Sequence, residues 1–281
     1  MDTETDLFQA RNLFYQGCFN LLLEKDLEEN ETVRILKGRA RRMLGKGNEI
    51  LWELKNETTP ESLALRAWIL YEEGDKEQGV SEIRSCISTS PKNTAVQILG
   101  GHVLYREEQY NEALQLLKGH SDNVEAVALM VQIFLKENKL KEAQEELEIA
   151  RTMAPDDVLI QLSEAWTDLY KGGQAALNSF YIYEELAQAI PTSLTLTGQA
   201  VAELQLGRLE DAEETLAQVL ELAPHDGDAL ANAIVTATLL GKDTSVYKEL
   251  LTLHHPSHEW VTSMMRQSAL FDELCESVQD I

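Results

Sequence analysis

Residues 124–155, VEAVALMVQIFLKENKLKEAQEELEIARTMAP, decide the fold of this chain. The stretch holds two apolar patterns of helical period, separated by the polar turn Asn138-Lys139, and Pro155 stops the second helix. Small or apolar residues recur where the two helices would meet, at Val131, Ala143, Leu147 and Ala150. Because such residues let helices approach closely, the stretch predicts an antiparallel helix pair.

The same pattern recurs in phase along the chain. Counting back from Pro91, Pro155 and Pro224 places equivalent helix pairs at residues 60–91, 124–155 and 193–224. This spacing resembles the tetratricopeptide repeat of about 34 residues, whose two helices are called A and B. Helix A ends at Gly74, Asn138 or Gly207, and these residue types adopt the left-handed conformation readily.

Less regular copies fill the remaining sequence. Residues 94–120 have a short helix B, residues 158–191 carry the extra turn residues Gly172-Gly173, and residues 227–253 have a shorter second helix. The complete set of predicted repeats is 6–23, 32–54, 60–91, 94–120, 124–155, 158–191, 193–224 and 227–253, with a terminal cap at 257–279. We therefore predict an all-α fold: one right-handed α-solenoid over residues 1–281, with a C-terminal capping helix that covers the last repeat.

Composition and charge narrow the classes of partner. Of the 281 residues, 44% are hydrophobic and 26% are charged, which suits a folded chain. A formal net charge of −24 disfavours direct binding of nucleic acid or of an anionic membrane. Five basic residues near the N-terminus could form a basic strip, although a solvated helix face is the favoured interpretation: Arg34, Lys37, Arg39, Arg41 and Arg42.

Motifs for catalysis, metals and membranes are weak. Gly45-Lys46-Gly47 lacks the first glycine, the Ser or Thr and the preceding strand of a phosphate-binding loop. His254, His255 and His258 lie around Pro256 without further ligands at metal-binding spacing, so neither a cofactor nor a metal is expected. The N-terminus lacks the basic and apolar segments of a secretory signal, and no apolar run is long enough to insert into a bilayer.

Three cysteines are spaced widely along the chain: Cys18, Cys86 and Cys275. Their odd number and wide spacing favour reduced thiols over a disulfide framework. Together with the weak motifs, this pattern predicts a cytoplasmic protein that is not an enzyme. An enzyme with a site of unfamiliar type stays a minor alternative.

The inner face of the predicted stack is the candidate binding site. In a tetratricopeptide stack, helix A lines the groove, and positions at i, i+4 and i+7 share one helix face. The predicted partner-binding groove comprises Trp68, Tyr71, Ile98, His102, Tyr105, Gln132, Leu135, Leu162, Trp166, Leu169, Val201 and Leu204. These side chains are mostly apolar or aromatic, so they indicate a protein-binding surface, although aromatic stripes of this kind also fill helix cores.

The groove lacks the residues that clamp an acidic peptide terminus. Such a clamp needs Asn, Lys and Arg on successive A helices. The neighbouring positions of this chain are Leu65, Leu99, Leu129, Ser163, Gly198 and Asn232, so a single Asn is in place. A clamp for acidic chaperone tails is therefore disfavoured.

Several segments resemble the epsilon subunit family of coatomer, the coat of retrograde Golgi vesicles. They include Leu7-Phe8 with residues 11–17, residues 124–147, the stretch from Leu159 through Tyr183, and residues 196–216. The most specific resemblance is Gln161-Leu162 to Trp166, followed by the Gly172-Gly173 insertion. The short repeat that ends at Gly119 is also typical of the family. Together the similar segments cover most of residues 7–241.

The resemblance implies a non-enzymatic structural subunit of the COPI coat. Such a subunit would bind and stabilise the C-terminal domain of the coatomer alpha subunit and would contact other coatomer subunits indirectly. It would be cytoplasmic and peripheral on Golgi membranes and vesicles, in Golgi-to-ER and intra-Golgi transport. The alternative left open by the residues is a generic tetratricopeptide adaptor or co-chaperone that binds an apolar peptide.

Overall fold

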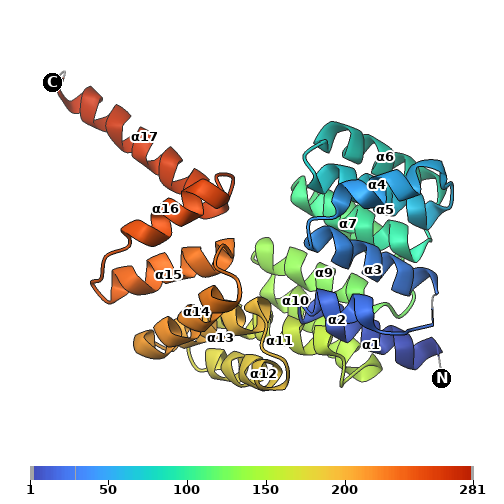
Figure 1. The fold of residues 1–281 in the computed structure, drawn as a ribbon, viewed down its shortest axis with the longest axis horizontal. Helices are drawn as coiled ribbons and strands as arrows, with labels where there is room; N and C mark the ends of the chain where they lie inside the picture. The colour runs from blue at the N-terminus through green and yellow to red at the C-terminus, as the bar shows by residue number, and fades with distance from the viewer. Residues whose placement is uncertain (1–2, 29, 280–281) are drawn as a thin grey trace. The chain divides into compact units, whose positions relative to one another are not determined.

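The computed structural model describes residues 3–28 and 30–279. Every regular element in these ranges is helical, so the predicted all-α fold is confirmed (Figure 1). The helices are α1 (Thr3–Tyr15), α2 (Phe19–Glu24), α3 (Glu31–Met43), α4 (Gly47–Glu53), the short 3-10 helix η1 (Leu54–Asn56), α5 (Pro60–Glu72), α6 (Lys76–Thr89), α7 (Thr94–Arg106), α8 (Tyr110–Leu117), α9 (Val124–Lys136), α10 (Leu140–Met153), α11 (Val158–Lys171), α12 (Ala175–Ala189), α13 (Ser193–Gln205), α14 (Leu209–Leu222), α15 (Gly227–Leu239), α16 (Ser245–His254) and α17 (Glu259–Gln279).

The lengths of the second helices follow the predicted irregularities. Helix α8 has 8 residues, whereas α6 and α10 have 14 each, so the repeat at 94–120 is short as expected. Helix α16 has 10 residues, which agrees with the shorter second helix predicted for 227–253. These differences arise where Gly119 and the segment 241–244 end or delay helix B.

Local capping explains where many helices begin and end. The side chain of Asn93 accepts a hydrogen bond from the Val96 amide at the start of α7, and Thr192 and Thr195 form a reciprocal capping box at α13. These bonds satisfy amides that have no partner inside the helix. At the end of α9, Asn138 has φ = 59°, which confirms the left-handed turn expected there.

Small residues bring the paired helices together, as the sequence predicted. Ala67, Ala143, Ala200 and Ala212 are all fully buried. At Gly79 the backbone of the facing helix itself is close, because an added Cβ would lie 2.7 Å from the Tyr71 backbone nitrogen. Helices α5 and α6 can therefore cross at this point only with glycine at position 79.

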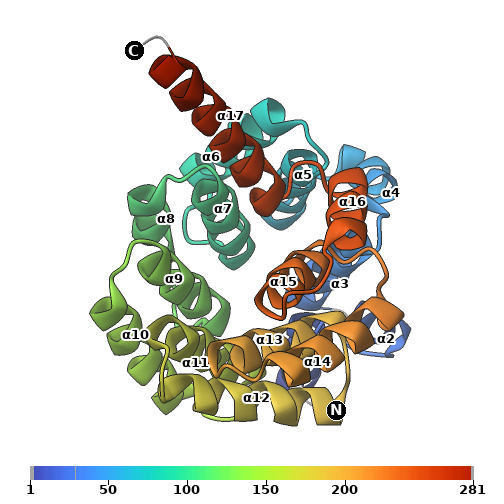
Figure 2. The same ribbon diagram turned by 90° about the vertical axis from the view of Figure 1, so that its left-hand side faces the viewer.

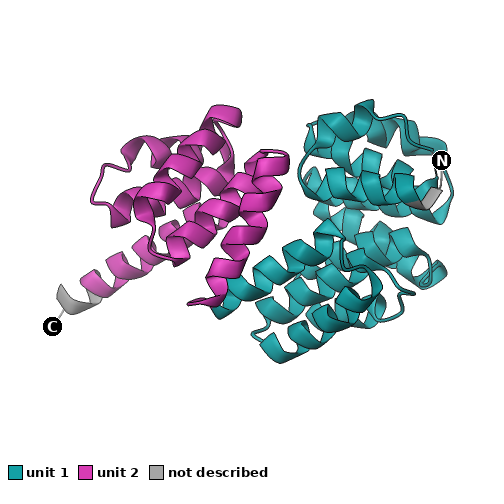
Figure 3. Ribbon diagram, turned by 90° about the horizontal axis from the view of Figure 1, so that it is seen from below, with its two compact units in different colours: residues 1–171 teal, residues 172–281 magenta. Residues whose placement is uncertain are grey.

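The chain divides into two compact units, residues 1–171 and 172–281 (Figure 3). The boundary falls at the extra turn residues Gly172 and Gly173, whose φ angles of +68° and +57° favour glycine. The predicted repeat at 158–191 is therefore shared between the units, with α11 in the first and α12 in the second. A single continuous solenoid stays a prediction.

The first unit has two adjoining apolar cores. One joins α3 to α7 through residues such as Leu65, Ile69 and Ile83, and the other joins α7 to α11 through Met130 and Ile133. In addition, α1 packs on α3 and on α11, so the N-terminal helix contacts the fifth repeat after its own. This long-range contact brings α1 and α3 to the A helices α9 and α11.

The second unit packs α12 to α16 around small residues, including Ala200, Ala229 and Ala233. Its last helix, α17, contributes Trp260 and Val261 to the final core cluster. From Thr262 to Cys275 its side chains are exposed apart from the half-buried Ser263, and the helix points away from α15 and α16 (Figure 2). The predicted cover of the last repeat is thus limited to the first turn of α17.

Candidate protein-binding site

The predicted groove residues fall into two burial classes. Trp68, Tyr71, Ile98 and Leu162 are buried. Eight others are half-buried: His102, Tyr105, Gln132, Leu135, Trp166, Leu169, Val201 and Leu204. Six of the eight belong to the first unit, on α7, α9 and α11, while Val201 and Leu204 lie on α13 of the second unit.

Trp68 and Tyr71 pack inside the first unit. The Arg42 guanidinium lies over the Trp68 ring, 5.9 Å from its centroid. The Tyr71 hydroxyl donates a 2.7 Å hydrogen bond to Glu107, and burial, followed by this contact, raises the pKa of Tyr71 to about 12. In the free chain these two rings support the helix pairs, because they are already covered by α3, α6 and α7.

A buried polar cluster joins α1 and α3 to the start of α9. Arg39 donates a 2.9 Å hydrogen bond to Glu125 and a 3.3 Å bond to the Tyr15 hydroxyl, which itself donates to Glu125 at 2.8 Å. The Arg39 guanidinium also lies 4.5 Å from the centroid of the Phe14 ring. A second contact, the 2.7 Å ion pair between Arg11 and Asp157, ties α1 to the residue before α11.

The electrostatics of this cluster follow from its burial. Desolvation raises the pKa of Tyr15 above its ordinary value. Burial alone would lower the pKa of Arg39, but Tyr15 and Glu125 raise this pKa. The Arg39 guanidinium therefore stays charged beside the Glu125 carboxylate. On α7, burial and then the charges of Arg39 and Arg106 lower the pKa of His102 to about 3, so this predicted groove residue is neutral at physiological pH.

This cluster corrects the interpretation of the basic segment as a solvated helix face. Arg39 is 5% exposed and belongs to the interior. By contrast, Arg41 pairs with Glu53 at 2.7 Å and Arg42 pairs with Glu73 at 3.3 Å on the surface. Burial of Arg39 was not predictable from the sequence, because a single buried arginine among five basic residues has no periodic signal. Gly38 and Ala40 beside it were the available hint of a close helix contact.

A cavity of about 170 Å³ lies next to the cluster, and Arg39 and Glu125 form part of its wall. Its remaining lining comes from α3, α5 and α7, including the predicted groove residue Ile98. The cavity therefore adjoins one part of the predicted inner face. It was not expected from the sequence, because it requires α3 and α9 to meet across residues far apart in the chain.

The segments with weak resemblance to phosphate-binding or metal-binding motifs lie in turns and helix ends of the fold. Gly45 and Lys46 lie in the turn between α3 and α4, with φ = +78° at Gly45, and Gly47 is the first residue of α4. The His225 and His254 rings stack with centroids 3.8 Å apart, and His258 contacts Asp228 at 3.1 Å. Within residues 3–28 and 30–279, no group of three or more His, Cys, Asp or Glu side chains is arranged to hold a metal ion.

The three cysteines are free thiols. Cys18 and Cys86 are buried, and Cys275 is exposed.

None of the helices in the described part of the chain combines the length and the hydrophobicity needed to cross a membrane.

Comparison with known proteins gives a consistent family. The model of the family described as coatomer epsilon subunit matches residues 3–279. Coatomer subunit epsilon-1 of Oryza sativa subsp. japonica is 29% identical, and the match covers 97% of this chain and 98% of that protein. The probable coatomer subunit epsilon of Schizosaccharomyces pombe is 32% identical, over 85% of this chain and 82% of its own.

Solved structures of low sequence identity share the fold. Cut9-Hcn1, from the APC/C hetero-tetramer, has a TM-score of 0.65 at 13% identity and covers 94% of this chain and 54% of the matched chain. A tetratricopeptide repeat protein from Parabacteroides merdae has a TM-score of 0.54 at 14% identity, over 90% of this chain and 98% of its own. These likenesses confirm the tetratricopeptide-like helical fold.

Proposed function

The chain belongs to the coatomer epsilon subunit family, and from this premise we propose that it is a non-enzymatic structural subunit of the COPI vesicle coat. It binds and stabilises the C-terminal region of the coatomer alpha subunit and meets other coatomer subunits indirectly. The observation that carries the proposal is the family match over residues 3–279, because it spans both compact units.

The binding surface in this proposal is the half-buried inner face of the first unit. Tyr105 on α7 and Trp166 on α11 are its aromatic anchors, and Leu135 and Leu169 extend the apolar area. Half-buried aromatic side chains lose their remaining exposure when a partner covers them, and such residues commonly dominate binding energy. The buried Trp68, Tyr71, Ile98 and Leu162 hold the helices that present this face.

This function also sets where the protein works. The chain is cytoplasmic and reaches Golgi membranes and COPI-coated vesicles through the coat, where it acts in Golgi-to-ER and intra-Golgi transport. Its net charge of −24 supports an indirect association, since anionic lipid surfaces repel an acidic protein.

Replacement of both aromatic anchors tests the surface. We expect the double variant Tyr105→Ala, Trp166→Ala to bind the purified C-terminal region of the alpha subunit more weakly, because a buried aromatic anchor contributes about 2–4 kcal/mol. Titration calorimetry measures the affinity, and circular dichroism checks that helix content is retained. Trp52→Ala is the matched control, because Trp52 is 78% exposed and belongs to α4, which contributes no residue to this face.

Tyr105 also contacts the core of the first unit, so its replacement affects packing as well as binding. A single variant on α11 tests the same face without changing Tyr105. Leu169→Glu places a carboxylate on the half-buried face of α11, where partner binding would have to desolvate it. Unchanged affinity in both the double variant and Leu169→Glu would show that the partner binds elsewhere.

Co-purification of the tagged chain from cytosol tests the function as a whole. Retention of the coatomer alpha subunit at one-to-one stoichiometry is the expected result. Substoichiometric recovery of many unrelated clients would instead favour the generic tetratricopeptide adaptor or co-chaperone.

A further inference from the structure

The cavity in the first unit has apolar walls that lead to a polar mouth. Ile35 and Leu36 of α3 face Ile98 and Leu99 of α7 across it, and all four are buried. The mouth is more accessible, because Glu31 and Thr94 are exposed and Glu61 and Asn93 are half-buried. A volume of about 170 Å³ is close to that of the engineered cavities of about 150 Å³ that hold benzene, so it accepts one long side chain.

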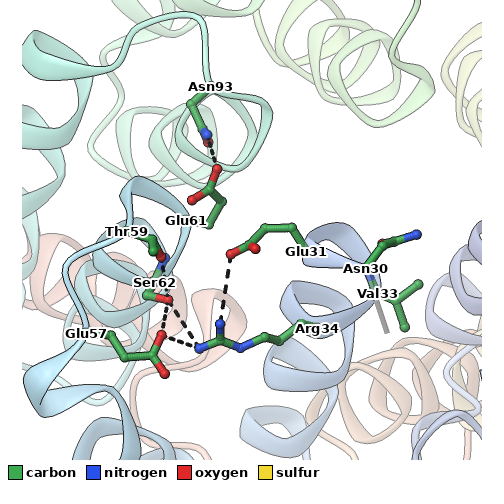
Figure 4. Close-up of polar contacts among 9 residues, drawn as sticks. All are labelled: Asn30, Glu31, Val33, Arg34, Glu57, Thr59, Glu61, Ser62 and Asn93. Carbon is green, nitrogen blue, oxygen red and sulfur yellow. Dashed lines mark hydrogen bonds and ion pairs between the residues drawn. The ribbon is translucent and has the colours of Figure 1, made fainter. Parts of the chain in front are cut away.

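Two carboxylates face the mouth without full charge compensation. Glu61 accepts a hydrogen bond from the neutral Asn93 amide, and no ion pair among the described residues involves Glu61 (Figure 4). Glu31 lies 4.0 Å from Arg34, but that guanidinium is held mainly by Glu57 and by Ser62 at 3.3 Å. Like charges at one opening repel each other, so a cation bound there lowers the energy of both.

One residue of the cavity wall, Arg39, has an unsatisfied donor. Arg39 is 5% exposed, and its two terminal nitrogens donate to Glu125 and Tyr15, yet its buried Nε–H has no hydrogen-bond partner in the described structure. A buried donor without an acceptor is unfavourable. This nitrogen has almost no accessible surface, so the choice of ligand depends on the walls and the mouth of the cavity.

We propose that this cavity binds a lysine or arginine residue of the protein partner, with its aliphatic stem between α3 and α7 and its cation at Glu31 and Glu61. This inference rests on the proposed function only for the identity of the partner, which is the alpha subunit. This recognition is opposite in sign to the clamps that tetratricopeptide proteins build from Asn, Lys and Arg for acidic termini.

Other ligand classes fit the cavity less well. A purely apolar side chain fills the walls but leaves the Glu61 charge without a cation and the Glu31 charge with only its 4.0 Å contact to Arg34. An anionic group would meet both carboxylates at the mouth, and the charge of Arg39 in the wall is already balanced by Glu125. A basic residue satisfies the apolar walls and the acidic mouth together.

A small probe tests the site without the partner. Nα-acetyl-lysine N-methylamide carries the cation, the stem and two carbonyl groups, and the neutral analogue Nα-acetyl-norleucine N-methylamide lacks the cation. Methyl NMR of the full chain, read at Ile98 and Leu99, reports occupancy. We expect the lysine probe to bind with a Kd on the order of 1 mM, as is typical for a ligand of this size, and roughly five- to tenfold more tightly than norleucine.

Charge removal at the mouth gives the decisive comparison. Glu61→Gln should weaken the lysine probe about fivefold and leave the norleucine probe unchanged, because only the cation interacts with this charge. Glu31→Gln is the second variant in case Glu61→Gln disturbs its contact with Asn93. Glu112→Gln, at a 55% exposed carboxylate of the same unit, is the matched control and should change neither probe.

The inference is overturned if the two probes bind equally or if neither carboxylate variant changes the preference. It is likewise overturned if neither probe shifts the Ile98 and Leu99 signals. A binding assay with the alpha subunit, run alongside, separates this result from the proposed function. Loss of probe binding with intact alpha-subunit binding removes the cavity inference alone, whereas probe binding without alpha-subunit binding supports the cavity and removes the partner assignment.

Discussion

At the scale of single residues, Arg39 shows how this fold tolerates an interior charge. Its carboxylate partner Glu125 is 7% exposed, and the Tyr15 hydroxyl bonds to both. A buried ion pair of this kind contributes little net stability compared with apolar residues of the same volume, but loss of one member leaves the other charge buried alone. The cluster therefore fixes where α1 and α3 meet α9 rather than adding much to the free energy of unfolding.

We expect Glu125→Leu alone to lower the free energy of unfolding by about 3–5 kcal/mol, because it leaves the Arg39 charge without a partner. The double variant Arg39→Met, Glu125→Leu should be more stable than Glu125→Leu, since neither charge then remains. Urea unfolding followed by circular dichroism measures both. Arg84→Met, which removes an exposed pair with Glu112, is the control and should cost at most about 1 kcal/mol. Equal losses in the single and double variants would contradict this account.

At the scale of elements, α17 differs from the other helices of the second unit. Trp260 and Val261 pack against α15 and α16, with Val261 2% exposed, but Phe271 and Leu274 are 66% and 64% exposed. A helix that exposes apolar side chains along most of its length gains little stability from packing. Its first turn is therefore the part that stabilises the unit.

Truncation after Gln267 tests this division of α17. We expect the shortened chain to unfold within about 2 °C of the full chain, because the removed side chains from Ser268 to Cys275 are exposed, whereas Val261→Ala should lower the Tm by several degrees. Differential scanning calorimetry measures both variants. A large drop in Tm on truncation alone would mean that the distal part of α17 is packed in solution.

At the scale of the whole molecule, each compact unit contains its own apolar cores. The first is built on Leu65, Ile69 and Met130, and the second on Ala200, Leu216 and Ala233. In a repeat stack, stability is close to a sum of repeat and nearest-neighbour terms, so a unit with complete cores needs few contacts from outside. The boundary at Gly172 and Gly173 separates these cores along the chain.

We expect residues 1–171, expressed alone, to be helical and to unfold in one cooperative transition, because their cores lie within that segment. Thermal unfolding of the fragment should match a transition of the full chain within a few degrees. If the fragment is only partly folded or loses cooperativity, the two units depend on each other, as the predicted continuous solenoid requires.

The sequence alone determined the helix pairs and their irregularities. The structural roles of Pro91, Asn138 and Ala143 can be inferred from the neighbouring sequence, because a cap, a left-handed turn or a helix crossing depends on residues within one repeat. The short α8 and the Gly172-Gly173 insertion were predictable for the same reason. The position of the inner face was also derived from repeat phase, although its role in binding stays a proposal.

The burial of individual side chains was decided by the tertiary structure. Trp68 and Ile98 belong to the predicted groove yet are covered in the free chain, and Arg39 is interior although it lies in a basic segment. The deciding contacts join Arg39 and Tyr15 to Glu125, over 86 and 110 residues of sequence. Such contacts depend on small rotations added over several repeats, which no pattern within a single repeat encodes.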